Sequence, residues 1–480
     1  MRRFVVFLSA ALALAGCEVG PNYRLPAAPQ GASGAFVSAA PAIAATGEIN
    51  DDWWRLYADP ALDGLIQDAL TNNKDLQTAA ANLAQSRALL LQARAGLLPS
   101  TSETFGADYG RSALADYVAS TNGRRAPDAW IYQAGLDVSY EVDLFGQVRR
   151  GIEAARADAQ ASQAALDLVR ITVAAETTRA YADACAFHEQ ADVARQSTQI
   201  EQQTFDIAKR QRDAGGSSDF DVARAATVLD QTRATIPTFE GQRRAALFQL
   251  AVLTGRPPAE ISQAADACLS PPVLTQPIPV GDGSALLRRR PDVRRAERQL
   301  AAATARVGVA TAGLFPQVTL GGTASSAAPT IGGLGNYPNV AFGVGPLISW
   351  TFPNLATAYA QTQAAKAGAS AALSSYQSAV LGALQETEQT LTAYGGELER
   401  HAALKSAQAN SSQALRLAKV RFDNGGASFL DLLDAQRTEA DTRAALAQSD
   451  ESLIADQIGV FKALGGGWRT APRIEPAKAN

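Results

Sequence analysis

Asp431 and Asp434 are two acidic side chains whose spacing could serve a function. Residues three apart on a helix share one face, so both carboxylates would lie on the same side of it. Asp431 also has a purely structural explanation, because Ser428-x-x-Asp431 has the spacing of a capping box. Asp434 has no capping role, and its counterpart in the first half of the chain is Arg224. Only the second half therefore carries both acids.

No pattern in the sequence indicates catalysis. The phosphate-binding GxxxxGK[ST] loop, the GxSxG elbow and the HExxH zinc motif are absent from it. The chain has two histidines, His188 and His401, and three cysteines, which argues against a zinc or copper site. Its formal net charge of −4 argues against nucleic acid as a partner. We therefore expect neither an enzyme nor a cofactor.

The first residues have the pattern of an export signal. MRR is followed by an apolar run of about a dozen residues, too short to span a bilayer but typical of a signal peptide. LAGC (14–17) resembles the lipobox of bacterial lipoproteins, in which the cysteine, here Cys17, is acylated and becomes the new N-terminus. Glu18, rather than Asp, implies passage to the outer membrane in that class. The alternative is an ordinary secretory signal with a chance cysteine.

Several other residues are expected in the core. Cys185 and Cys268 are few for an exported chain of this size, so a disulfide framework is not required. The two could pair only if folding brings them together, and we expect both to be buried as small apolar side chains. Trp53, Trp54 and Tyr57 could form an aromatic ligand site, but core packing is the favoured interpretation.

The sequence repeats itself at long range. The matching pairs are LAKVRFDNGGASFLDLLDA (417–435) with IAKRQRDAGGSSDFDVARA (207–225), ATAGLFPQ (310–317) with ARAGLLPS (93–100), and GPLISWTFP (345–353) with GLDVSYEVD (135–143). Each half thus consists of a helix, two strands, a very long helix, a Gly-Gly turn and a second helix. Residues 152–213 contain no Gly or Pro and are rich in Ala, which predicts a helix of about 65 residues with its flanks. Residues 355–424 are its counterpart.

Prolines mark several helix boundaries. Asp59-Pro60 predicts an N-cap followed by proline at the first helical position, and Pro291 opens another helix. Pro237 should kink or break the helix that begins near Ser218. The basic run at 288–295 is interpreted as a helix start with ion pairs.

Between these helices the hydrophobic period changes from 3.6 to 2. Residues 130–140 and 340–350 each show one apolar face with aromatic residues at the ends, which is typical of transmembrane barrel strands. Residues 101–111 and 317–325 are the expected partner strands. The alternative is two amphipathic hairpins on a soluble core.

Four strands cannot close a barrel, since single-chain barrels begin at about eight. Open edges are not tolerated in lipid, because each unpaired backbone group costs several kcal/mol there. Several chains must therefore pool their strands. This argument does not fix the number of chains; three would supply 12 strands.

Five stretches together carry a resemblance to a known family. They are CEVGPNY (17–23), DDWWRLYADPALDGLIQDALTNNKDL (51–76), YEVDLFG (140–146), LLRRRPDVRRAERQLAAATARVG (286–308) and FDNGGASFLDLLDAQR (422–437). With them the chain resembles the outer-membrane efflux proteins, the TolC-type channels, and most closely their lipoprotein branch (OprM-like and NodT-like).

The resemblance implies a mainly α fold with a transmembrane β portion. A homotrimer would form a 12-stranded barrel in outer-membrane lipid, continued by a long α-helical barrel. Such channels are passive ducts that export drugs or other small molecules. They couple through a periplasmic membrane-fusion adaptor to an inner-membrane pump, often of the proton-driven RND type.

The expected layout divides the chain into six parts. These are a signal peptide (1–16), a lipidated N-terminus with an extended linker (17–50), the first repeat (51–270), a linker (271–285), the second repeat (286–468) and a C-terminal tail (469–480).

The resemblance also implies a periplasmic gate, because Asp431 and Asp434 align with the family's aperture aspartates. In a trimer each would form a ring of three carboxylates, which could select cations or hold the aperture closed by pairing with basic residues. Asp221 is the matching acid of the first half, and it too has capping-box spacing, from Ser218. The candidate partners for closure are Arg212, Lys419 and Arg421.

The turns Gly215-Gly216 and Gly425-Gly426 would lie at the periplasmic end, where the adaptor docks. As helix C-caps, they also have a structural role. The competing interpretation of the whole chain is a lipid-anchored periplasmic helical scaffold or adaptor without a channel.

Overall fold

The computed structural model describes residues 18–39, 44–45, 47, 49–111, 113–274 and 276–474. Cys17 therefore lies outside the described residues, as do 475–480. The chain divides into two compact units. Unit 1 comprises Met1–Leu25, Gln85–Ala161 and Ala296–Tyr376, and unit 2 comprises Pro26–Ala84, Ser162–Arg295 and Gln377–Asn480.

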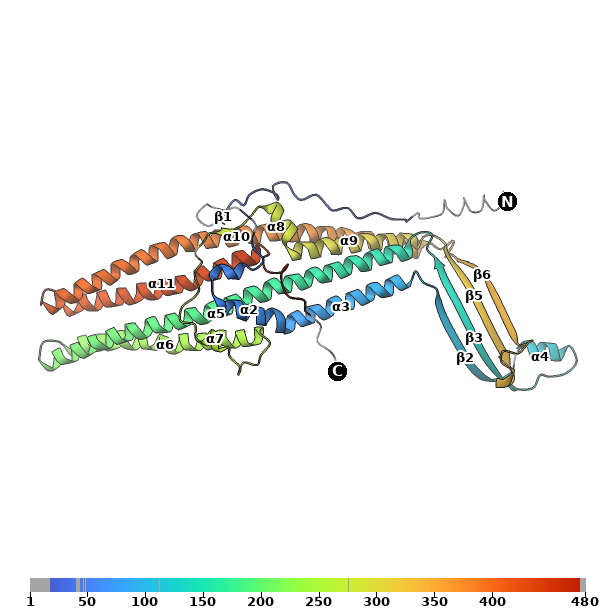
Figure 1. Ribbon diagram of the computed structural model, residues 1–480, viewed down its shortest axis with the longest axis horizontal. Coiled ribbons are helices and arrows are strands. Elements are labelled where there is room, and N and C mark those ends of the chain that lie inside the picture. Colours follow the sequence, from blue (N-terminus) through green and yellow to red (C-terminus); the bar gives the residue numbers. More distant parts are fainter. Residues whose placement is uncertain are drawn as a thin grey trace. The chain divides into compact units, whose positions relative to one another are not determined.

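Helices form most of both halves of the chain. The first half has η1 (Trp53–Tyr57), α2 (Pro60–Asn72), α3 (Lys74–Ala95), α4 (Ala113–Ser120), α5 (Gln147–Asp213), α6 (Asp219–Leu253) and α7 (Gln263–Asp266), and the second half has α8 (Gly283–Arg289), α9 (Pro291–Ala312), η2 (Ile331–Gly333), α10 (Ala356–Asp423) and α11 (Phe429–Ala463). The long helices α5 and α10 have 67 and 68 residues, and each is followed by a helix of 35 residues. The doubling predicted from the sequence is thus present in the structure, as two antiparallel helix pairs (Figure 1).

Helix α2 begins as predicted, because Asp59 accepts hydrogen bonds from the backbone N–H groups of Ala61 and Leu62. Pro237 was expected to kink or break its helix, and a break is wrong, since α6 continues through it. Side-chain bonds to α5 hold α6 on both sides of this proline. Thr232 donates to Glu201 at 2.9 Å, and Arg195 donates to Glu240 at 2.7 Å. The cost of one missing backbone hydrogen bond is offset by this lateral packing.

Unit 1 contains one antiparallel sheet of four strands. The strands are β2 (Ser100–Gly110), β3 (Ala129–Val142), β5 (Gln317–Ala328) and β6 (Val340–Ser349), in the order β2-β3-β5-β6. The sheet is open, with β2 and β6 at its edges (Figure 1). Unit 2 adds a short parallel pair, β1 (Ala44–Ala45) with β4 (Ile278–Pro279). The segment between β2 and β3 contains α4.

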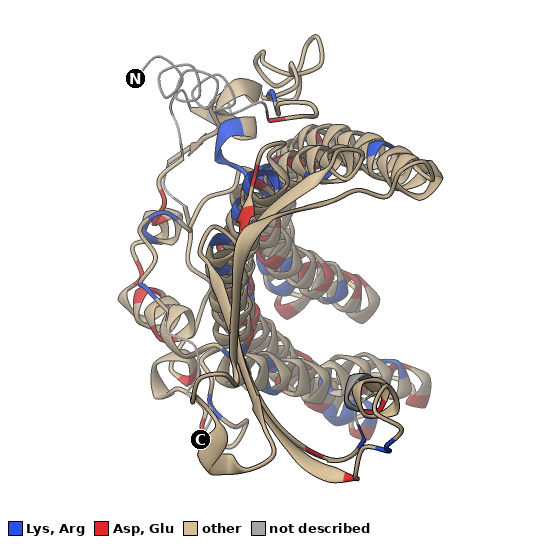
Figure 2. Ribbon diagram, turned by 90° about the vertical axis from the view of Figure 1, so that its right-hand side faces the viewer, with Lys and Arg blue, Asp and Glu red and all other residues tan. Residues whose placement is uncertain are grey.

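The register of the sheet gathers most of the large apolar side chains on one face, which also carries Glu103 opposite Leu136. Pairing of Leu136 with Ala324, and of Ala324 with Phe342, places these residues on one face. The same face carries Phe105, Tyr109, Trp130, Val344 and Ile348, all of them exposed in the single chain. The opposite face carries Asp108, Asp137, Thr323, Ser325 and Gly343. None of the four strands contains a lysine or arginine, whereas both charge signs are interspersed along the helices (Figure 2).

Among the described residues, no helix combines the length and the apolar character needed to cross a bilayer.

The core of unit 2 confirms the structural interpretation of the aromatic residues. Trp53 is fully buried and stacks on Phe461 of α11, with ring centroids 4.5 Å apart.

Two arginines of the basic run at 288–295 bind backbone carbonyls beside this core. Arg289 donates to the carbonyls of Ile49 and Gly465, and Arg290 donates to that of Ala463 and pairs with Asp292 at 2.7 Å. Arg289 and Arg290 therefore satisfy carbonyl groups at the C-terminal end of α11, where the helix dipole favours positive charge.

The expectation for Cys185 and Cys268 is wrong, because the two residues form a disulfide. Cys185 is fully buried on α5, and Cys268 is half-buried just after α7. The pairing joins residues 83 positions apart in sequence. Helix α7 brings its end onto the face of α5, which sequence spacing alone does not indicate.

Candidate functional site

The two Gly-Gly turns end the long helices of both pairs. Gly215 and Gly425 have φ angles of 76° and 72°, in the left-handed region that favours glycine. The next glycines donate backwards, from Gly216 to the carbonyl of Gln211 at 2.8 Å and from Gly426 to that of Arg421 at 2.7 Å. These bonds satisfy helix-end carbonyls, so the C-cap role of the glycines is confirmed.

A capping box follows each turn. The backbone N–H of Ser428 donates to Asp431 at 2.9 Å, and the N–H of Asp431 donates back to the Ser428 hydroxyl at 3.1 Å. Ser218 and Asp221 form the same box. The hydrogen bonds from Ser428 hold the pKa of Asp431 below its usual range, and those from Ser218 do the same for Asp221. Both acids therefore remain charged and stabilise the starts of α11 and α6.

Asp434 differs from Asp431, because it is exposed and has no hydrogen bond or ion pair with any described residue. Of the candidate partners, Arg421 donates to the carbonyl of Gly426 at 3.3 Å and lowers the pKa of Asp431 further. Arg212 instead bonds acids of its own turn, and Lys419 is exposed, with no bonded partner among the described residues.

The partners of Arg212 were not anticipated from the sequence. Its guanidinium donates to Asp213 at 2.9 Å and to Asp219 at 3.2 Å, across the turn between α5 and α6. Those hydrogen bonds raise the pKa of Arg212. The structure of the single chain thus brings no candidate arginine or lysine into an ion pair with Asp431 or Asp434.

A contact between the two helix pairs near these turns was also missed. Ala208, Ala225 and Leu433 form a buried apolar cluster, with Phe205, Val222 and Phe429 packed against it. Next to it, Gln436 of α11 donates to Thr204 of α5 at 2.6 Å. The signal in the sequence was an apolar residue at spacing three or four on each helix. This cluster holds α11 against α5 and α6 close to the turns.

The residues after Cys17 are held at the start of α5 in unit 1. The backbone N–H of Val19 donates to the carbonyl of Phe145 at 3.2 Å. Glu18 lies 3.8 Å from the guanidinium groups of both Arg149 and Arg150. Strand β3 ends at Val142, so the first described residues are fixed within a few positions of the sheet.

Comparison with known proteins gives consistent matches. The family model "Outer membrane efflux protein" matches residues 65–256 and 283–466. The chain is 28% identical to nodulation protein T of Rhizobium leguminosarum bv. viciae (98% of this chain, 94% of that protein). It is 30% identical to outer membrane protein OprJ of Pseudomonas aeruginosa (95% and 94%). The solved structure of the outer-membrane channel OprN has a TM-score of 0.86 at 33% identity (94% and 100%).

Proposed function

Because this chain belongs to the outer membrane efflux protein family and is an outer-membrane efflux channel with the TolC-type fold, we propose that three copies form one passive duct. The observation that carries this proposal is the open four-stranded sheet with an apolar face. Its edge strands β2 and β6 would pair between neighbouring chains, because unpaired backbone groups are too costly in lipid. Three chains would thereby close one barrel, and the duct would carry small molecules without a catalytic step.

The duct would act with partners in the periplasm and the inner membrane. The proposal is that a membrane-fusion adaptor contacts the turns Gly215-Gly216 and Gly425-Gly426 and connects the duct to an RND-type pump. Each turn leaves open space beside its first glycine, since a side chain at Gly215 or Gly425 would meet no other part of the chain within 4 Å. Such turns could accept a docking helix or loop without rearrangement.

At the same turns, Asp431 and Asp434 would form the periplasmic gate, with Asp221 as the matching acid and Arg212, Lys419 and Arg421 as candidate partners. The lack of a bonded partner for Asp434 within the described chain supports a role between chains. Replacing Asp434 with Ala is expected to raise single-channel conductance in planar bilayers, because the carboxylate that would pair with a basic residue of a neighbouring chain and hold the aperture closed is removed. The double variant with Asp431→Ala should show a larger increase.

Asp441→Ala is the matched control, since Asp441 is also an exposed aspartate of α11. This control should leave conductance unchanged. If Asp434→Ala also left conductance and cation preference unchanged, the gate assignment would be wrong.

We further propose that Cys17 is acylated and anchors the chain in the outer membrane. Support comes from Glu18 and Val19, which are bonded to the segment that directly follows β3. An acyl group on the preceding residue would then reach the lipid next to the sheet. Mass spectrometry of the N-terminal peptide should show diacylglyceryl and N-acyl additions on Cys17, absent from Cys17→Ser. An unmodified Cys17 in mature protein would refute the anchor.

A further inference from the structure

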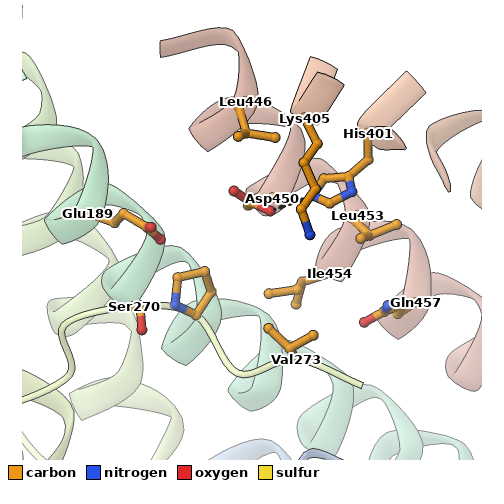
Figure 3. A pocket seen from close by; sticks show the side chains of 11 residues that line it. Glu189, Ser270, Val273, His401, Lys405, Leu446, Asp450, Leu453, Ile454 and Gln457 are labelled. Atoms are coloured by element: carbon orange, nitrogen blue, oxygen red, sulfur yellow. Dashed lines mark hydrogen bonds and ion pairs between the residues drawn. The ribbon is translucent and has the colours of Figure 1, made fainter. Parts of the chain in front are cut away.

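A cavity of about 420 Å³ lies in unit 2, where α5, α10 and α11 meet the segment that follows α7 (Figure 3). Its volume falls within the range of small-molecule sites, which is roughly 300–1,000 Å³. Leu446, Leu453 and Ile454 of α11 form an apolar wall, and Val273 adds to it from the segment after α7. Charged groups from three different helices enter the same space.

The disulfide between Cys185 and Cys268 fixes the segment that forms one side of this cavity. Cys185 lies one helical turn before Glu189 on α5, so both side chains are on the same face of that helix. Cys268 lies two residues before Ser270, where the segment begins to line the cavity. A covalent bond thus holds the lining segment next to Glu189.

Of the two carboxylates that line the cavity, Asp450 has a hydrogen-bonding partner and Glu189 has none among the described residues. His401 of α10 and Asp450 of α11 are hydrogen bonded, with Nε2 and Oδ1 2.8 Å apart. Glu189 is half-buried and has no hydrogen bond or ion pair with any residue that the structure describes. Burial and the neighbouring carboxylate of Asp450 raise the pKa of Glu189. A half-buried carboxylate next to a second one is stabilised by a cation between them.

The chemistry of the lining restricts which cation fits. The described residues include no group of three His, Cys, Asp or Glu side chains that could hold a metal ion. The apolar wall instead matches an organic body, and the two carboxylates match a protonated amine. Lys405 belongs to α10, on the other side of the cavity from Glu189 (Figure 3), and its side chain is exposed.

We propose that this cavity binds an amphipathic organic ammonium ion, with its nitrogen between Glu189 and Asp450 and its apolar body against Leu446, Leu453 and Ile454. This binding site uses none of the residues of the turns or of the sheet. It does not require that the cation pass through the duct.

Calorimetric titration of the full-length channel in detergent tests the site. The probe is 2-phenylethylammonium, and 2-phenylethanol and 3-phenylpropanoate are its neutral and anionic counterparts. The ammonium ion should bind the wild-type channel, and Glu189→Gln should weaken this binding at least about tenfold, because the ammonium group exchanges a charged acceptor for a neutral amide oxygen, which forms a weaker hydrogen bond. Asp450→Asn should weaken it too. Glu399→Gln, an exposed position on α10, should bind as the wild type does.

Three results would overturn the proposal. One is equal binding of the ammonium ion and the alcohol, which would indicate partitioning into apolar surface or detergent. Another is unchanged binding in both Glu189→Gln and Asp450→Asn. The third is preferential binding of 3-phenylpropanoate that is lost in Lys405→Gln, which would make this a site for anions.

Discussion

Replacing Cys185 and Cys268 with alanine is expected to lower the free energy of unfolding by about 4 kcal/mol, because the disulfide closes a long loop. Linking residues 83 positions apart restricts the unfolded chain far more than the folded one. The bond also holds the segment after α7 against α5, so its loss should loosen that segment first. The measurement is denaturant unfolding of the purified channel in detergent, with and without reductant.

Two comparisons separate the bond from the cysteine side chains. Reductant should destabilise the wild type and leave the double-alanine variant unchanged, because only the wild type has a bond to lose. With reductant present, the two proteins should have similar midpoints, apart from the smaller packing loss at buried residue 185. A wild-type midpoint that does not respond to complete reduction would contradict the predicted stabilisation.

Phe342→Arg should prevent most of the protein from assembling in the outer membrane. Phe342 lies on the apolar face of β6 and is 84% exposed in the single chain. An arginine that faces lipid costs from about 1 kcal/mol near the interface to about 2–4 kcal/mol at the bilayer centre, and in an oligomer this cost recurs in every copy. We therefore expect a loss of heat-resistant oligomers from outer-membrane fractions, measured by electrophoresis without boiling.

Ala341→Arg is the matched control, because the neighbouring residue of the same strand points to the opposite, polar face. This variant should still assemble, since an arginine there would face water. Equal assembly of both variants would mean that the hairpins stay in water, as the helical-scaffold interpretation requires. Equal failure of both variants would point to general damage of β6 and would contradict the assignment of the faces.

Local signals predicted much of the secondary structure. The long helices followed from Ala-rich segments without Gly or Pro, and the strands followed from alternation. The capping boxes at Ser218 and Ser428 and the left-handed glycines were also predictable, because each depends on residues within one helical turn. The resemblance then gave the family, which the comparisons confirm.

The candidate site was predictable only in part. The sequence identified the turns and the acids next to them, because both follow from local motifs. It did not show that Arg212 bonds Asp213 and Asp219, nor that an apolar cluster with Leu433 joins the helix pairs. These contacts depend on which helices become neighbours, and periodicity does not specify the neighbour.

The sequence by itself determined the helices, the strands, their caps and the need for partner chains, because these follow from short-range sterics and from the cost of unpaired backbone groups in lipid. Only the tertiary structure decided that Cys185 bonds Cys268, that α6 continues through Pro237, and that Glu189 shares a cavity with Asp450. Each of these features joins elements that are distant in sequence. Their geometry is set by the packing of whole helices against one another, which no local pattern encodes.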